Sequence, residues 1–382
     1  IQTSNLNKLA LLSGIIKYPC NMKLRKHPFL VLFFLLLINP VTLLPQSSNS
    51  EYPFLRPDLN VINNSKSLQN KLISTFSDSS SEKILKIFIV GDSYTASGDF
   101  AKYLEEVLIS EFGDGGKINL SLKNEFPTLL PYQPLLIKKE SQSITGFELL
   151  SLADSSSIEV KDVSSKAIPF TTVNPKKGRN LKVTFPSPVE SFYLGSKSNV
   201  PQKSTKGIIS LTEKGVITTY FGRVAASIRT YNTELNHVFP FLEAVNPDLV
   251  IIYLGTNDCA GPNFNLSYFN VEYGNLYNRI KKAVPDASFL LVSPLTFYSY
   301  GSKGYGPNKN IKVLKEGIAA LSQKEGLSYW DMSEVIGGDT IMPYWVKANL
   351  AISDYIHLTP KGQEIAAKFL AKAIIDVYRK KD

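Results

Sequence analysis

Two hydrophobic patterns alternate along most of the chain. Short, mainly apolar runs, typical of strands buried on both faces, occupy residues 84–90, 248–254, 288–294 and 327–331. Apolar residues at helical spacing predict helices at about 99–112, 231–244, 269–283, 309–324 and 360–378. Strands that alternate with helices indicate a parallel sheet covered by helices on both faces. We therefore predict an α/β domain formed by residues 83–116 and 215–382.

A different pattern fills the stretch between these two segments. Residues 117–214 contain short β-type runs separated by turns rich in Pro, Gly and Ser. The runs are 135–137, 147–150, 158–160, 181–185, 191–194 and 207–211. We predict an inserted all-β sandwich here. The alternative is an elaborate set of surface loops, which would be unusually long for a compact domain.

The N-terminal residues have the pattern of a targeting segment. Met22–Lys26 is basic, and residues 29–38 are all apolar. That run is too short to span a bilayer as a helix but fits the hydrophobic region of a secretory signal. We interpret residues 1–50 as upstream sequence and a signal or anchor segment, with an uncleaved membrane tether and a buried core helix as alternatives. We accordingly expect export to the periplasm, the cell envelope or the outside. Residues 51–82, which are rich in Ser, Asn and Pro, are predicted to be a linker or arm.

Charge and cysteine content narrow the function classes. The formal net charge is +9, from 42 Lys and Arg and 33 Asp and Glu. Five of the basic residues and none of the acidic ones lie in residues 1–50, so the rest of the chain is only mildly basic. No basic run interleaved with aromatic residues appears, so we expect no nucleic-acid partner. The cysteines, Cys20 and Cys259, offer neither an internal disulfide in the exported protein nor a metal cluster. We expect no metal and no cofactor; the oligomeric state is open.

A serine stands where the first predicted strand ends. In open α/β folds ligands bind at the carboxyl ends of the strands, so Ser93 is a candidate nucleophile if a base is available. His27 lies in the leader, and His237 falls in a predicted helix, which leaves His357. Asp354, three residues earlier, is close enough in a turn to accept the Nδ1 proton and to leave Nε2 facing the serine. A structural role for His357 and Asp354 is the alternative.

Acyl transfer also needs donors aimed at the developing oxyanion. Gly255–Asp258 ends the strand at 248–254, so the Asn257 amide and the Ser93 backbone N–H are candidate donors at the same sheet edge. A third donor would come from residues 221–226, which contain Gly222 and Ala225. An ordinary strand-end turn is the alternative interpretation of Gly255–Asp258.

These stretches, in this order, resemble the SGNH branch of the GDSL esterase/lipase family. The resemblance is carried by Gly91–Tyr94, Gly255–Asp258 and Asp354–His357. It implies a flavodoxin-like three-layer αβα sandwich with a parallel sheet. It also implies a Ser93–His357–Asp354 triad, with Ser93, Asn257 and a further backbone N–H in the oxyanion hole. The family's oxyanion glycine aligns with Ala225, with Gly222 three residues earlier. An alanine N–H would serve equally if its φ is negative.

A narrower resemblance, to the peptidoglycan O-acetylesterases of this superfamily, suggests the substrate. Residues 329–331, 337–338 and 344–345 carry it, together with the position of the β insertion. It implies an exported serine esterase acting on O-acetyl groups of a polysaccharide such as peptidoglycan, with a jelly-roll-like, carbohydrate-binding insertion. Asp92, Tyr94 and Trp345 are then candidate substrate-binding residues, and Trp330 and Tyr344 are further aromatic candidates. Each of these aromatic residues could equally be core.

Two alternative functions stay open at this point. The same triad would serve a lipase, a thioesterase or an O-acetyltransferase. The chain could also be a non-catalytic polysaccharide-binding protein.

Overall fold

The structure is a computed structural model that describes residues 51–77, 83–120, 135–138, 143–150, 158–173, 180–197, 207–301 and 304–380. All of these residues belong to one compact unit, Ser50–Asp382. The predictions of a leader and of a membrane tether fall on residues 1–50, outside the described residues. In the part of the chain that is described, no helix combines the length and hydropathy needed to cross a membrane.

A six-stranded sheet forms the centre of the α/β domain. Its strands, in spatial order, are β1 (Ile62–Asn63), β16 (Ser328–Trp330), β13 (Ser288–Val292), β12 (Leu249–Tyr253), β2 (Ile84–Gly91) and β11 (Gly215–Gly222). β1 pairs antiparallel with β16, and the other five strands are parallel. Read across the sheet from β11 to β16, these five strands are the second, first, third, fourth and fifth along the chain, which is the flavodoxin-like order. This confirms the predicted fold class. The point at which the strand order reverses lies between β2 and β12.

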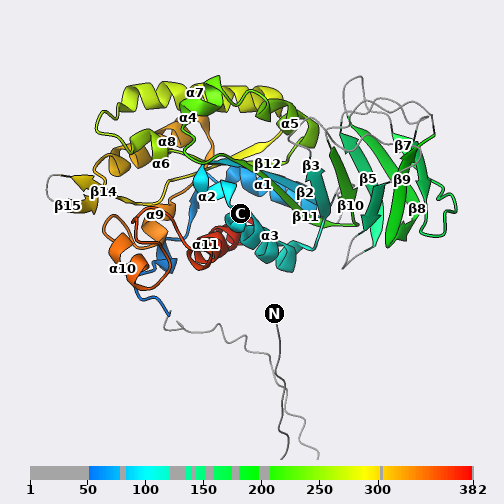
Figure 1. The fold of residues 1–382 in the computed structure, drawn as a ribbon, viewed down its shortest axis with the longest axis horizontal. Helices are drawn as coiled ribbons and strands as arrows, with labels where there is room; N and C mark the ends of the chain where they lie inside the picture. The colour runs from blue at the N-terminus through cyan, green and yellow to red at the C-terminus, as the bar shows by residue number, and fades with distance from the viewer. Residues whose placement is uncertain are drawn as a thin grey trace, which may run out of the picture. The chain divides into compact units, whose positions relative to one another are not determined.

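Helices cover both faces of the sheet, as the strand patterns require. Strands β12 and β13 are buried along their whole length, because both of their faces are packed. One face packs against α1 (Lys66–Phe76), α3 (Asp99–Phe112) and α11 (Pro360–Arg379). The other packs against α4 (Ile228–Thr233), α5 (Val238–Val245), α7 (Leu266–Ala283) and α8 (Asn310–Glu325). Figure 1 shows α3 and α11 on one side of the sheet and α4, α5, α7 and α8 on the other.

Short elements sit at the ends of the strands or between the helices. They are η1 (Pro57–Leu59), α2 (Ser93–Ala96), α6 (Thr256–Cys259), α9 (Met332–Val335) and α10 (Met342–Lys347), and the hairpin strands β14 (Tyr298–Gly301) and β15 (Gly304–Pro307). The predicted helix at 231–244 is wrong in extent, because α4 ends at Thr233 and α5 begins at Val238.

Residues 51–77 belong to the α/β domain and are not a linker, which corrects the prediction for this segment. β1 adds a strand to the sheet edge, and Leu68 and Leu72 of α1 are fully buried in the same core as β2 and β12. The Trp330 Nε1–H donates to Asn60 Oδ1 at 2.9 Å, which further fixes the segment. Some of the polar residues that suggested a linker, Ser67, Asn70 and Ser74, lie on the exposed face of α1.

Residues between α3 and β11 form two antiparallel sheets. One has the order β3 (Gly116–Leu120), β10 (Gly207–Leu211), β5 (Ile144–Leu150), β8 (Leu181–Val189) and β7 (Thr171–Val173). The other has the order β4 (Leu135–Lys138), β9 (Ser191–Ser196) and β6 (Ile158–Lys161). Side chains from both sheets share one apolar core, in which Phe147 stacks on Phe192 at 5.0 Å between ring centroids. This is the packing of a sandwich.

Candidate active site

Ser93 follows the turn that ends β2 and begins the short helix α2. Asp92 caps α2, with its Oδ1 accepting the Tyr94 N–H at 3.1 Å. A Cβ on Gly91 would lie 2.0 Å from Thr95 Oγ1 and 3.0 Å from the carbonyl oxygen of Tyr253, so glycine allows the close approach of α2 and β12 at this point. The turn leaves Ser93 half-buried at the carboxyl edge of the sheet, while its neighbours on both sides are buried.

The structure brings Ser93, His357 and Asp354 together. Ser93 Oγ lies 3.1 Å from His357 Nε2, across 264 residues of sequence. His357 Nδ1 lies 2.7 Å from Asp354 Oδ2. Both distances are hydrogen-bonding distances, and they place a base on the serine and an acceptor on the far ring nitrogen.

The loop that carries the histidine is ordered by the aspartate. Asp354 Oδ1 accepts the backbone N–H groups of Ile356 at 2.8 Å and His357 at 3.0 Å. Partial burial opposes the charge of this carboxylate, but the hydrogen bonds from the His357 side chain and the two N–H groups outweigh it and lower the pKa of Asp354. Tyr355, inside this tight turn, has a φ of 60°, a conformation that costs a non-glycine residue about 1–3 kcal/mol.

Tyr94 joins the serine turn to the histidine loop. Its hydroxyl donates to the carbonyl of Ile356, and its ring stacks on Tyr253 with centroids 5.5 Å apart. The residue is buried, so it does not contact solvent or a substrate. Tyr94 is therefore a positioning residue, and the prediction that it binds substrate is corrected.

The end of β12 supplies the next group at the same edge. Asn257, in α6, is half-buried, and its Nδ2 donates to the carbonyl of Ala226 at 2.9 Å. An amide nitrogen carries two hydrogens, so one donor stays available. The neighbouring Asp258 accepts the N–H of Ile228 with both carboxylate oxygens, at 3.1 and 3.2 Å, and burial raises its pKa to about 6. The two side chains of α6 thus hold the turn that contains residues 223–228.

That turn contains Ala225, one of the predicted oxyanion donors. Ala225 is exposed, and its φ is 60°, so it does not meet the condition of a negative φ under which its N–H would serve equally. The alanine adopts the left-handed conformation that glycine favours, which explains why a glycine would suit this position. Gly222 has a different reason to be glycine: a Cβ there would lie 2.3 Å from the backbone nitrogen of Ala96. Close packing of β11 on α2 therefore accounts for Gly222.

The burial of each side chain decides whether the remaining predicted substrate-binding residues can contact a substrate. Asp92 is fully buried, its Oδ2 has no hydrogen-bond partner among the described residues, and burial raises its pKa to about 7 although the Tyr94 N–H opposes this. Trp345 and Trp330 are fully buried as well, and the Trp345 Nε1–H donates to the carbonyl of Ile336 at 3.0 Å. The predictions that Asp92, Trp345 and Trp330 contact substrate are therefore corrected, because all three belong to the core. Tyr344 is exposed.

One residue that supports the site has no sequence motif. The Tyr231 hydroxyl, on α4, donates to the carbonyls of Gly91 at 2.6 Å and Phe221 at 3.1 Å. It ties the end of β2, two residues before Ser93, to the end of β11. Its sequence signal is weak, because Tyr231 stands among Arg, Thr and Asn residues in α4.

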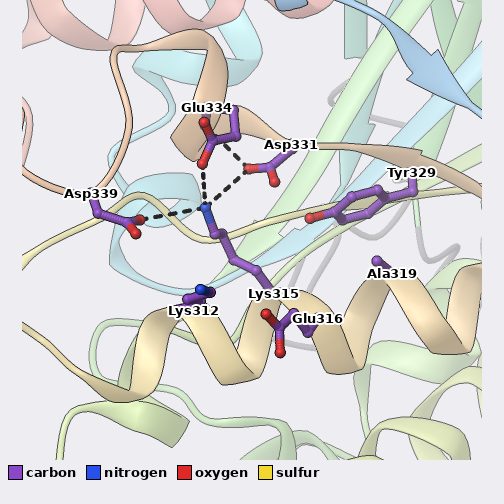
Figure 2. Close-up of a pocket in the computed structure, with 8 residues that line it drawn as sticks. All are labelled: Lys312, Lys315, Glu316, Ala319, Tyr329, Asp331, Glu334 and Asp339. Atoms are coloured by element: carbon purple, nitrogen blue, oxygen red, sulfur yellow. Dashed lines mark hydrogen bonds and ion pairs between the residues drawn. The ribbon is translucent and has the colours of Figure 1, made fainter.

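A second group of charged residues lies between α8 and α9 (Figure 2). The side chain of Lys315 is 8% exposed, and its ammonium lies 3.0 Å from Glu334, 3.6 Å from Asp339 and 3.8 Å from Asp331. Burial opposes the charge of Lys315, but the three carboxylates outweigh it and raise the pKa of the lysine. Across the described ranges, no group of three His, Cys, Asp or Glu side chains could hold a metal ion.

Comparisons with known proteins agree with this geometry. Residues 211–365 match the model of the GDSL-like lipase/acylhydrolase family. The matched range contains Asn257, Asp354 and His357 but begins after Ser93, from which the β insertion separates it. No curated protein sequence matches the chain.

Among solved structures, a peptidoglycan O-acetylesterase is similar with a TM-score of 0.58 and 16% identity, over 83% of this chain and 97% of that one. An acetyl xylan esterase, AlAXEase, is similar with a TM-score of 0.32 and 18% identity, over 42% and 81% of the two chains. A catalytic mutant of the acetylxylan esterase Axe2 from Geobacillus stearothermophilus has a TM-score of 0.32 and 14% identity, over 44% and 75%. The family match places a GDSL-like lipase/acylhydrolase domain in residues 211–365, and this match supports a carboxylic ester hydrolase.

Proposed function

We propose that this protein is an exported serine esterase that removes O-acetyl groups from a glycan such as peptidoglycan. The observation that carries the proposal is the chain of two hydrogen bonds from Ser93 through His357 to Asp354, at the switch point of the sheet. The export leader expected at residues 1–50 and the β-sandwich inserted after Ser93 support a polymer substrate outside the cytoplasm. The overall similarity to a peptidoglycan O-acetylesterase supports the same substrate class.

In the proposed mechanism Asp354 accepts the Nδ1 proton of His357, which leaves the Nε2 lone pair facing the serine hydroxyl. Ser93 Oγ attacks the ester carbonyl carbon, and its proton moves to Nε2. The new C–O bond forms as the carbonyl π electrons move to oxygen, giving a tetrahedral oxyanion. The lowered pKa of Asp354 keeps its carboxylate charged beside the resulting imidazolium.

Two N–H donors would stabilise the oxyanion: the Ser93 backbone and the Asn257 amide. The Asn257–Ala226 hydrogen bond fixes the position of this amide against the turn after β11. The oxyanion then collapses and expels the sugar oxygen, which takes the Nε2 proton and leaves as an alcohol. Water attacks the acetyl-enzyme with His357 again as base, which releases acetate and restores Ser93.

Acetate release tests the proposal. We expect the wild-type protein to release acetate from O-acetylated peptidoglycan. It should release none from the same material after alkaline deacetylation. Acetylated xylan serves as the competing polymer, and p-nitrophenyl esters of two to twelve carbons test whether a longer acyl chain is preferred. Hydrolysis confined to long-chain esters would contradict the glycan assignment and favour a lipase.

A further inference from the structure

Four tyrosines lie together beside the loop that carries the proposed base. Tyr298 and Tyr300 belong to β14, Tyr305 belongs to β15, and Tyr355 lies between Asp354 and His357. The two hairpin strands pair so that Tyr300 is directly opposite Tyr305. The sequence alone does not predict this group, because the hairpin and the loop are about fifty residues apart.

The rings form a continuous row from the core to the surface. The Tyr355 ring lies between Tyr298, at 5.9 Å and an interplanar angle of 26°, and Tyr305, at 5.5 Å and 30°. Tyr300 meets Tyr305 edge to face, at 5.4 Å and 76°. The Tyr298 N–H donates to the Tyr355 carbonyl at 3.0 Å. The β14–β15 hairpin therefore contacts the loop of Asp354 and His357 through both aromatic rings and a backbone hydrogen bond.

The inner and outer members of the row differ in exposure. Tyr298 is 9% exposed and Tyr355 is half-buried, so packing of the loop accounts for these two. Tyr305 is 56% exposed and Tyr300 is 77% exposed. Large aromatic rings that remain in water gain little from folding, so their burial does not account for their presence.

The outer rings are accessible to a flat partner, because most of the surface of Tyr300 and of Tyr305 is exposed. An acyl chain would need an enclosed apolar cavity to leave water, and two open rings do not provide one.

We infer that Tyr300 and Tyr305 are a stacking platform that holds a sugar ring of the glycan next to the Ser93–His357–Asp354 site. This rests on the proposed function and specifies its substrate-binding residues. A pyranose ring presents apolar C–H groups on its faces and hydroxyls around its rim. A tyrosine presents an apolar face and a polar edge, so the two rings can stack while their polar groups keep their hydrogen bonds to water. Because Tyr305 contacts Tyr355, a sugar on the platform is held at a fixed place relative to His357.

Alanine variants of the two outer tyrosines test the platform, with Tyr268→Ala as the matched control. Tyr268 is an exposed tyrosine on α7, 49% exposed. The measured quantity is the ratio of kcat/KM for O-acetylated peptidoglycan oligosaccharides to kcat/KM for p-nitrophenyl acetate, which has no sugar. We expect Tyr300→Ala and Tyr305→Ala each to lower this ratio roughly 3- to 10-fold, mainly through KM for the oligosaccharide. Tyr268→Ala should leave it at the wild-type value, and Tyr305→Phe should retain most of it.

The ratio separates binding from a merely structural role. If Tyr305 only supported the catalytic loop, its removal would lower both rates together and the ratio would stay unchanged, which would overturn the platform. Calorimetric binding of the deacetylated oligosaccharide to the wild type and to Tyr300→Ala gives an answer that does not depend on catalysis. Weaker binding by the variant supports the platform, and equal binding overturns it. Failure of the wild type to hydrolyse either ester would instead contradict the proposed function.

Discussion

Asp354 contacts His357 twice, through its Oδ2 to the ring Nδ1 at 2.7 Å and through its Oδ1 to the backbone N–H at 3.0 Å. One carboxylate thus fixes both the imidazole and the main chain from which it projects. The two oxygens have separable tasks. Oδ1 accepts a backbone N–H, which any carbonyl-type oxygen could do, whereas the ring Nδ1–H needs the atom at the Oδ2 position to be an acceptor as well.

Asp354→Asn separates these tasks. The amide oxygen can still accept the backbone N–H groups, but its NH₂ cannot accept the Nδ1 proton, so the ring is left in the wrong tautomer. We expect kcat for p-nitrophenyl acetate to fall roughly 10³- to 10⁴-fold with little loss of stability. Initial rates and thermal unfolding measure the two effects. A variant that keeps a tenth of wild-type kcat would contradict the role given to Asp354.

Asn257→Ala removes the side-chain donor proposed for the oxyanion. The expected loss is roughly 10²- to 10³-fold in kcat with KM nearly unchanged, because the hydrogen bond strengthens only in the transition state. Asn257→Asp is the matched variant, since it keeps the shape but cannot donate as a carboxylate. Similar losses in both variants support donation. Near-normal activity of Asn257→Asp would show that Asn257 acts only by packing.

Ala225→Gly tests the conformation of the turn after β11. Glycine adopts a φ of 60° without the Cβ clash, so we expect the free energy of unfolding to rise by up to about 1 kcal/mol while the backbone N–H and the activity remain. Ala226→Gly is the control, because Ala226 is buried and lies outside the left-handed region. That change should destabilise the protein. Urea unfolding measures both, and a destabilised Ala225→Gly protein would count against the strained turn.

Asp92→Asn makes stability depend less steeply on pH. Burial raises the pKa of Asp92 from its ordinary 3.8 to about 7, so the folded protein holds a proton in this window that the unfolded chain releases. Wild-type stability attributable to this group therefore falls as pH rises from about 4 to about 7. The difference in unfolding free energy, variant minus wild type, should increase over that interval, by no more than about 4 kcal/mol. A difference that is constant between pH 4 and pH 8 would show that Asp92 ionises normally.

Local relationships in the site were predictable from the sequence. The serine after β2 and the Asp354–His357 spacing each depend on a few neighbouring residues, and the strand patterns gave the sheet edge on which they meet. The strand β11 was missed because Thr218 and Thr219 interrupt its apolar run. Helix α1 was missed because its few buried leucines stand among Ser, Asn and Lys.

Contacts between distant segments were not predictable in this way. The hydrogen bonds from Tyr94 to Ile356 and from Asn257 to Ala226 depend on how separate elements pack. The tyrosine row likewise forms only when the β14–β15 hairpin docks on the loop at Tyr355. Aromatic residues near a motif also gave wrong predictions of substrate contact, because Trp330 and Trp345 are fully buried in the core.

Ser93→Ala tests the central claim most directly. The change removes only Oγ from a half-buried position, so the variant should unfold at the wild-type temperature. We predict that it loses hydrolysis of p-nitrophenyl acetate and of O-acetylated peptidoglycan, by at least about 10³-fold. We also predict that the wild type, but not the variant, accumulates an acetyl group on the tryptic peptide containing residue 93. Wild-type-like turnover by a folded Ser93→Ala protein would contradict the account.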